Sequence, residues 1–273
     1  PALNQHESVT AKKQVKRMNA WPTLSAEKPL AGIRVLEITK AWAGPLAGRH
    51  LADMGADVFV IDPPAGQATR VHHFPGGPDQ MWPHFYNRGG GFNQFNRNKR
   101  GLSLDIRHPD GRQQILDMVK NIDVLIENNT VRVMPNFQLD YETLKAVNPK
   151  LVMCSISGFG ATGPHANYFA TGKILEASGG LVAQTGYNET DLYGTATFIA
   201  DPMAGTLAPL TMSAAIIEML DSGEGRHIDM SLQECVTTFV IDGIFRHQVT
   251  GSTLPPRVNR SLIAAPQGVY QCA

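Results

Sequence analysis

The feature that most restricts the fold of this 273-residue chain is an alternation of short apolar runs with helical segments. Strands rich in β-branched residues are predicted at 34–39, 57–62, 102–106, 123–127 and 151–155. Helices are predicted at 45–54, 109–120 and 141–147, and the first of them ends at Gly55. Strand, helix and strand in so few residues favour right-handed βαβ units. The sequence therefore predicts an α/β fold with a Rossmann-like doubly wound parallel sheet.

The second half of the chain predicts three more helices and a domain boundary. One helix is expected over 170–182, one from Asp201 to about Leu220, and one over 232–249 after a strand at 226–230. Ser231 is the predicted N-cap of the last helix, with Glu234 completing a capping box. Residues 251–260 are rich in Pro, Ser, Thr and Arg. We expect an arm at 1–28, a large domain at 29–250, and a linker with the start of a smaller, largely missing domain at 251–273.

Charge and composition narrow the classes of partner. The 24 basic and 24 acidic side chains balance, which gives no reason to expect nucleic acid or an anionic membrane. The longest uncharged window, 202–217, is short for a bilayer and indicates a buried helix. Three cysteines inside or beside apolar runs are typical of reduced thiols. We therefore predict a cytoplasmic protein with no membrane partner.

Several common catalytic signatures are absent. The turn at 39–45 lacks the glycine spacing of a dinucleotide fingerprint, and neither a phosphate-binding loop nor a G-x-S-x-G elbow occurs. Histidines stand at 72, 73 and 84, but no cysteine or carboxylate accompanies them at ligand spacing. Loop histidines are therefore favoured there, and we predict no metal.

The sequence around Asp201 allows two interpretations of its role. It precedes Pro202, which is tolerated at the first helical position, so Asp201 is placed as an N-cap. Alternatively it is a nucleophilic carboxylate held against backbone N–H groups. Local sequence alone favours the cap.

Many ordered motifs carry a family resemblance. They are residues 29–37, 43–45, 51–58, 96–100, 104–105, 123–128, 148–149, 157–160, 162–164 and 223–231. Together they resemble the class III CoA-transferase family, of the formyl-CoA transferase and carnitine CoA-transferase type, which also contains 2-methylacyl-CoA racemases. The resemblance covers nearly all of the chain from Pro29 onward.

The resemblance implies an architecture and a set of functional residues. Family members have a Rossmann-like domain, a smaller domain and an interlocked dimer, so a homodimer or a heterodimer with a related subunit is expected. The family nucleophile is the aspartate of an Asp-x-x-x-Gly pattern, which Asp201 and Gly205 match. No tightly bound cofactor is implied, because coenzyme A enters as a thioester substrate beside a carboxylic acid. The positions implied to contact CoA are Lys40, Ala41, Trp42, Ala43, Leu104, Arg107, Asn128, Asn129 and Thr130.

A carboxylate is the side chain that this chemistry requires, because only Asp or Glu can hold CoA as a thioester at its own carbon. The chain departs from the family pattern at Asn129, where phenylalanine is usual, at Asn136, where arginine is frequent, and at Gly172, near the racemase histidine. Glycine cannot act as a base. The sequence thus favours a CoA-transferase, with an acyl-CoA racemase or isomerase, or a non-catalytic subunit of a hetero-oligomeric CoA-transferase, as alternatives.

Overall fold

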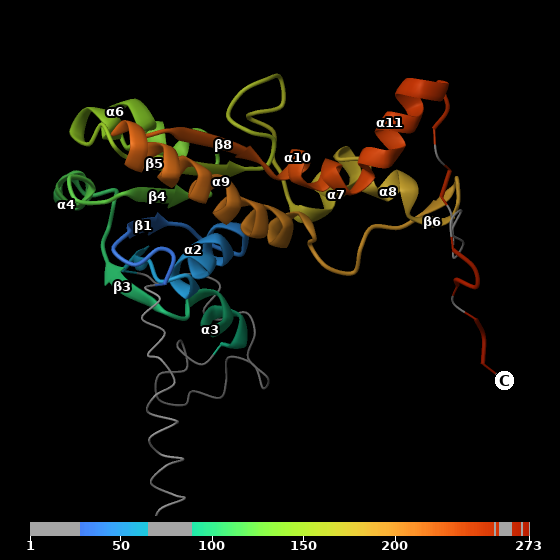
Figure 1. Ribbon diagram of the computed structural model, residues 1–273, viewed down its shortest axis with the longest axis horizontal. Coiled ribbons are helices and arrows are strands. Elements are labelled where there is room, and N and C mark those ends of the chain that lie inside the picture. The colour runs from blue at the N-terminus through green and yellow to red at the C-terminus, as the bar shows by residue number, and fades with distance from the viewer. Residues whose placement is uncertain (1–27, 65–88, 254, 257–263, 269, 273) are drawn as a thin grey trace, which may run out of the picture.

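The core of the fold is a parallel six-stranded sheet. The computed structural model describes residues 28–64, 89–253, 255–256, 264–268 and 270–272. The strand order is β3-β2-β1-β4-β5-β8; Figure 1 labels β3, β1, β4, β5 and β8 in this order. The strands are β1 (Arg34–Ile38), β2 (Asp57–Asp62), β3 (Lys99–Ser103), β4 (Val124–Glu127), β5 (Val152–Ser157) and β8 (His227–Ser231). The predicted α/β parallel sheet is confirmed.

Helices cover both faces of the sheet because neighbouring strand residues point to opposite sides. Val35 belongs to the core under α2 (Ala43–Asp53) and α9 (Ala200–Ser222). Leu36 belongs to the core on the other face, where α4 (Pro109–Val119) and α6 (Tyr141–Val147) lie. Two short helices complete this part: α3 (Gly90–Asn96) and α5 (Val133–Asn136).

The edge strand is displaced from its predicted position. The run predicted at 102–106 forms β3 three residues earlier, because β3 pairs with β2 from Lys99 to Ser103. Beyond it, the Asp105 carboxylate accepts a hydrogen bond from the Arg107 amide, which turns the chain toward α4. An exposed edge strand lacks the apolar signal by which strands are recognised.

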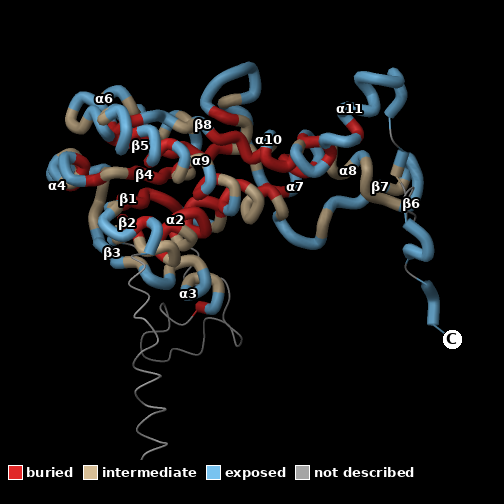
Figure 2. The backbone as a smooth tube through the Cα atoms, viewed as in Figure 1, coloured by how far each residue is buried: buried red, intermediate tan, exposed pale blue. Residues whose placement is uncertain are grey.

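A second group of elements extends away from the sheet, to the right in Figure 1. It comprises α7 (Gly172–Ser178), α8 (Leu181–Gln184), β6 (Gly186–Asn188), β7 (Asp191–Leu192), α10 (Leu232–Thr237), the 3₁₀ turn η3 (Thr238–Val240) and α11 (Ile241–Thr250). Figure 2 shows mainly exposed backbone in its outer part, in contrast to the buried sheet. Its exposed large side chains include Phe239, Phe245 and Val249.

Two predicted helices are interrupted in this group. The helix expected over 170–182 divides into α7 and α8 because Gly180 adopts φ +87°, a left-handed conformation. The helix expected over 232–249 divides at Val240, whose φ of −113° and ψ of 15° are not helical. Its beginning is as predicted, since Ser231 Oγ accepts the Glu234 amide at 3.3 Å.

The long apolar helix α9 extends beyond the uncharged window of the sequence. Among the described helices it alone is long and apolar enough to cross a membrane, by length and composition only. In the fold, 44% of its most apolar window is buried, and its inner face packs on the sheet and α2. A core position accounts for the apolar inner face of α9, whereas Leu210, Ile217 and Leu220 on the same helix are exposed. The predicted arm at 1–28, except for Lys28, and half of the linker at 251–260 lie outside the described residues.

Candidate active site at the carboxyl edge of the sheet

Asp201 lies in the first turn of α9 but is not its N-cap. The helix begins at Ala200, and Ile199 is the N-cap residue with φ −60° and ψ −24°. The predicted cap position of Asp201, with Pro202 first in the helix, is therefore wrong by two residues. The reason lies outside the helix: the Ile199 amide donates to the Glu176 carboxylate at 3.3 Å, which replaces a local cap.

The Asp201 carboxylate is half-buried against the start of α2. Burial raises its pKa, while a hydrogen bond from the backbone N–H of Ala43, the first residue of α2, opposes that rise. The carboxylate thus lies at the N-termini of two helices, where backbone N–H groups favour an anion.

Close contact between the two helices produces this arrangement. A Cβ added to Gly205, one turn after Asp201, would lie 2.8 Å from the Ala43 carbonyl oxygen and 2.9 Å from Leu46 Cβ. Only glycine at this position lets α9 approach α2 so closely.

Asp201 opens onto a cavity of about 510 Å³. The predicted positions that line it with Asp201 are Ala41, Ala43, Asn128, Asn129 and Thr130. Sequence reasoning did not find two other features of its wall: the aromatic residues Tyr168 and Phe169 and the cation Arg132.

A second cavity, of about 550 Å³, adjoins the first through Ala41 and Asn129, which line both. Lys40, Leu104 and Arg107 line only the second. Arg107 makes two 2.8 Å contacts with Asp105, which lower the pKa of that carboxyl to about 2. Asp105 lines the same cavity and balances the charge of Arg107 there, so Lys40 is the side chain that adds net positive charge to the second cavity.

The loops between the two cavities are tied together by asparagine side chains. Asn128 accepts the Lys40 amide at 2.9 Å and donates to the Lys40 carbonyl at 2.7 Å. Asn129 is buried and donates its side-chain amide to Ile38 O and Glu127 Oε2, each at 3.2 Å. Both side chains therefore hold the loop after β1 beside the loop after β4, with Ala41 in a left-handed conformation at φ 65°.

Trp42 is not brought together with the other predicted positions. It lines neither of the two cavities, and its ring packs against Phe95 with centroids 5.5 Å apart. Its apolar surface is used in packing between α2 and α3.

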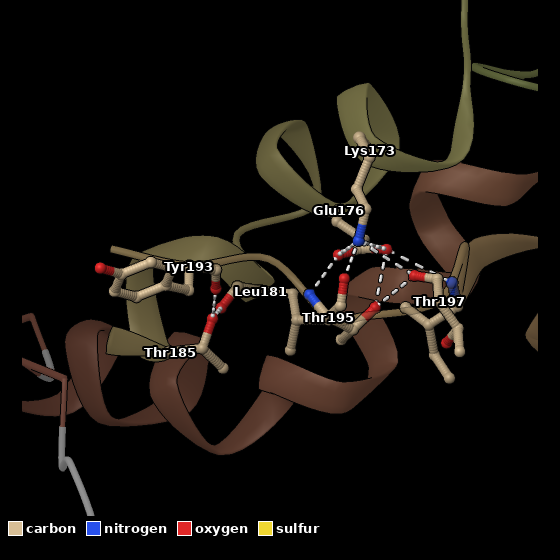
Figure 3. A network of polar contacts seen from close by, with 8 residues as sticks. Lys173, Glu176, Leu181, Thr185, Tyr193, Thr195 and Thr197 are labelled. Carbon is tan, nitrogen blue, oxygen red and sulfur yellow. Dashed lines mark hydrogen bonds and ion pairs between the residues drawn. The ribbon is translucent and has the colours of Figure 1, made fainter. Parts of the chain in front are cut away.

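A polar clamp fixes the segment that leads into Asp201, as Figure 3 shows. Glu176, fully buried on α7, accepts the Thr195 amide at 2.8 Å and the Thr195 hydroxyl at 2.9 Å. Lys173 pairs with Glu176 at 3.4 Å and donates to the Thr197 carbonyl at 3.1 Å. The hydrogen bonds lower the pKa of Glu176 against the opposing effect of burial. Its one sequence signal is weak: a single acidic residue inside a mainly apolar helix.

Gly172 stands at the position that matches the histidine of the family's racemases, and it packs against the same segment. A Cβ at Gly172 would lie 2.6 Å from Phe198 Cβ. Phe198 thus fills the space that a side chain at position 172 would need.

The part of the chain that the structure describes holds no group of three or more His, Cys, Asp or Glu side chains suited to a metal ion. The histidines at 72, 73 and 84 lie outside the described residues.

An open parallel α/β sheet, with a half-buried carboxylate in one cavity at its carboxyl edge and a second cavity adjoining the first, defines a Rossmann-like protein. Sequence comparison gives the family: a match to CoA-transferase family III covers residues 30–273. The chain belongs to this family.

Named relatives and solved structures agree with this assignment. The succinate–glutarate CoA-transferase of Agrobacterium fabrum is 34% identical over 82% of this chain, and the succinyl-CoA–D-citramalate CoA-transferase of Chloroflexus aurantiacus is 32% identical over 90%. The chain spans 56% and 60% of the lengths of these two relatives. The crystal structure of a CaiB/BaiF family protein from Brucella suis matches with TM-score 0.78 and 32% identity, covering 89% of this chain and 63% of that one.

Proposed function

We propose that this protein is a CoA-transferase that moves CoA from an acyl-CoA donor to a carboxylic acid through a thioester on Asp201. The observation that carries the proposal is the position of the Asp201 carboxylate, held by the Ala43 N–H in a cavity that adjoins a second, cationic one.

The geometry suits each part of an acyl-CoA. Lys40 and Arg107 would face the phosphates in the second cavity, since cationic side chains bind phosphate well. The pantetheine chain would pass Ala41 and Asn129, where the cavities meet, and bring the thioester to Asp201. The Ala43 N–H would stabilise negative charge at the reacting carboxyl.

The reaction then proceeds without a change of redox state. The Asp201 carboxylate attacks the thioester carbonyl, which forms a mixed anhydride and releases CoA thiolate. The thiolate attacks the Asp201 carbonyl, which forms the aspartyl thioester and releases the donor acid. An acceptor carboxylate attacks that thioester, and the returning thiolate attacks the acceptor carbonyl, so Asp201 is regenerated.

One contact favours transfer over racemisation. Racemisation needs a second group to exchange the α-proton, but position 172 carries no side chain and Phe198 occupies the adjoining space. Deuterium incorporation at the α-carbon without an acceptor acid would support racemisation instead.

We also propose a cytoplasmic dimer, formed with an identical or a related subunit, with residues 29–250 as the large domain. Support comes from the exposed apolar side chains of α11 and η3, which need a covering surface. The retained Asp201 and its N–H donor speak against a purely non-catalytic subunit.

The test is intact-mass spectrometry of the purified protein after incubation with a panel of acyl-CoAs. We expect a CoA adduct that maps to Asp201, that hydroxylamine releases, and that Asp201→Ala lacks while retaining the wild-type circular dichroism spectrum. Adduct formation at another acid, or turnover by Asp201→Ala, would exclude the proposed nucleophile.

A further inference from the structure

A third cavity, of about 130 Å³, lies on the face of the sheet that carries α5 and α6. Its walls come from β4, β5 and β8 and from the residues around these two helices. Asn129, Val131 and Ser157 line both this cavity and the Asp201 cavity, so the two adjoin. Since a water molecule in the liquid occupies about 30 Å³, the space suits a molecule of roughly four or five non-hydrogen atoms.

Glu127, the last residue of β4, lines this cavity as a buried carboxylate without a cationic partner. Its side chain is 5% exposed, and Oε2 accepts the Asn129 backbone amide at 2.8 Å and the Asn129 side-chain amide at 3.2 Å. The Ser155 hydroxyl donates to the same carboxylate. None of the ion pairs between described residues includes Glu127. Its charge is therefore left for a ligand to balance.

The other ionisable groups of the cavity do not compensate this charge. No Lys or Arg stands among the described residues that line it. Asp140 is engaged as the N-cap of α6, where it accepts the Thr143 amide at 3.1 Å. His227 is hydrogen-bonded to Ser155 at 3.0 Å, and burial lowers the pKa of its ring, against the opposing effect of Asp229. A lowered pKa favours the neutral ring, so the cavity is acidic.

Ser157 gives a second, independent indication of a ligand. It is 7% exposed, and its hydroxyl oxygen is buried without a hydrogen-bond partner in the part of the chain that the structure describes. Ser155 pairs with Glu127 across β4 and β5, and Ser157 lies two residues further on, so all three side chains leave the same face of the sheet. A buried hydroxyl without a partner costs free energy that a bound donor or acceptor would recover.

The rest of the wall selects the kind of cation. It is apolar and is formed by Val131, Met134, Pro135 and Met153. A short alkyl chain would remove this surface from water. A metal ion fits less well, since the described residues hold no group of three or more His, Cys, Asp or Glu suited to one. A primary ammonium group carries a charge and three N–H donors, which suit a carboxylate and a free hydroxyl.

We propose that this cavity binds a short primary alkylammonium ion, with its N–H groups donating to Glu127 and Ser157 and its alkyl chain against the apolar wall. Access is from the surface, because Ala161 and His227 line the cavity and are exposed. The site is separate from the proposed CoA chemistry, and its test uses neither CoA nor Asp201.

The experiment is isothermal titration calorimetry of the purified protein at neutral pH with three small ligands. They are propylammonium, 1-propanol, which has the same number of non-hydrogen atoms but no charge, and tetramethylammonium, which has the charge but no N–H donor. The variants are Glu127→Gln and Ser157→Ala. Glu142→Gln is the control for the loss of one negative charge, since Glu142 is exposed on α6 and does not line the cavity.

We expect the wild type to bind propylammonium saturably and at least 10-fold more tightly than 1-propanol or tetramethylammonium, a minimum of about the size of one charge-assisted hydrogen bond. Glu127→Gln should weaken propylammonium binding by about 10- to 100-fold, and Ser157→Ala by about 3- to 10-fold. Glu142→Gln should match the wild type. Circular dichroism verifies the fold of each variant, and the comparison of ligands on the wild type tests the proposal even where a variant does not fold.

Four results would overturn the proposal. The first is the absence of saturable propylammonium binding to the wild type. Equal affinity for 1-propanol would show an apolar cavity that makes no use of the Glu127 charge, and equal affinity for tetramethylammonium would show that no N–H donor is recognised. An equal loss in Glu142→Gln and Glu127→Gln would show attraction to the general negative charge of this surface.

Discussion

The sharpest test of the packing beneath the site is the buried ion pair between Lys99 and Glu37. Lys99 Nζ lies 2.8 Å from Glu37 Oε2, and the two side chains are 1% and 0% exposed. Lys99 also donates to the Pro45 carbonyl at 2.7 Å, in the first turn of α2. Burial lowers the pKa of Lys99, and Glu37 opposes that shift. The pair therefore joins β1, β3 and the helix whose Ala43 N–H holds Asp201.

We expect Lys99→Met to reduce the free energy of unfolding by about 3–5 kcal/mol, because it leaves the Glu37 carboxylate buried without its partner. The loss should shrink at lower pH, since an unpaired buried carboxyl prefers to be protonated. The double variant Glu37→Met/Lys99→Met should recover most of the loss, because a buried pair replaced by apolar groups is close to neutral.

The assay is urea denaturation at neutral pH of the wild type, both single variants and the double variant, analysed as a double-mutant cycle. The urea concentration at the midpoint of unfolding should differ between the variants, while the dependence of the unfolding free energy on urea concentration stays constant. A loss below about 1 kcal/mol in Lys99→Met, the range of exposed pairs, would refute the argument that this pair is buried and coupled.

Three further predictions concern the site itself. Glu176→Gln should lower kcat for CoA transfer while KM changes little, because the residue at 176 no longer pairs with Lys173 and holds the segment before Asp201 less firmly. Steady-state kinetics measure both constants, and a change in KM alone would contradict a positioning role. Burial raises the pKa of Asp201 above its value in the unfolded chain. Between the unfolded and the folded pKa, the folded protein therefore keeps a proton that the unfolded chain releases. The free energy of unfolding falls as the pH rises through this interval. Asp201→Asn should therefore be more stable than the wild type above the interval and equal to it below, as urea denaturation at the two pH values would show. Gly172→Ala should cost about 1–3 kcal/mol through overpacking against Phe198, and an unchanged melting temperature would mean that Phe198 moves freely.

The central strands could be predicted from sequence because they are buried on both faces. Each reads as a short apolar run bounded by turn residues, and β4 and β5 lie within two residues of their predicted bounds. The edge strand β3 was misplaced for the opposite reason, since its residues Lys99–Ser103 are largely exposed.

The polar interior of the site could not be predicted from sequence. Glu176 and Thr195 are far apart along the chain and meet only because α7 lies beside the segment that leads into α9. The pairing of Asn128 with Lys40 likewise needs β1 and β4 to be neighbours. Local patterns report periodicity and turn chemistry, whereas these contacts depend on tertiary packing. The cap assigned to Asp201 failed in the same way, because the acceptor for the Ile199 amide came from another helix.

The Asp-x-x-x-Gly pattern has a physical meaning that connects the local sequence with the tertiary packing. Residues four apart lie on the same face of a helix, so Asp201 and Gly205 both face α2. Gly205 removes the atoms that would collide with the Ala43 carbonyl and Leu46, and this lets the Asp201 carboxylate reach the Ala43 N–H. The same closeness buries the carboxylate and raises its pKa. One packing condition, the absence of a side chain at position 205, thus sets both the position of the proposed nucleophile and the electrostatic cost of keeping it ionised.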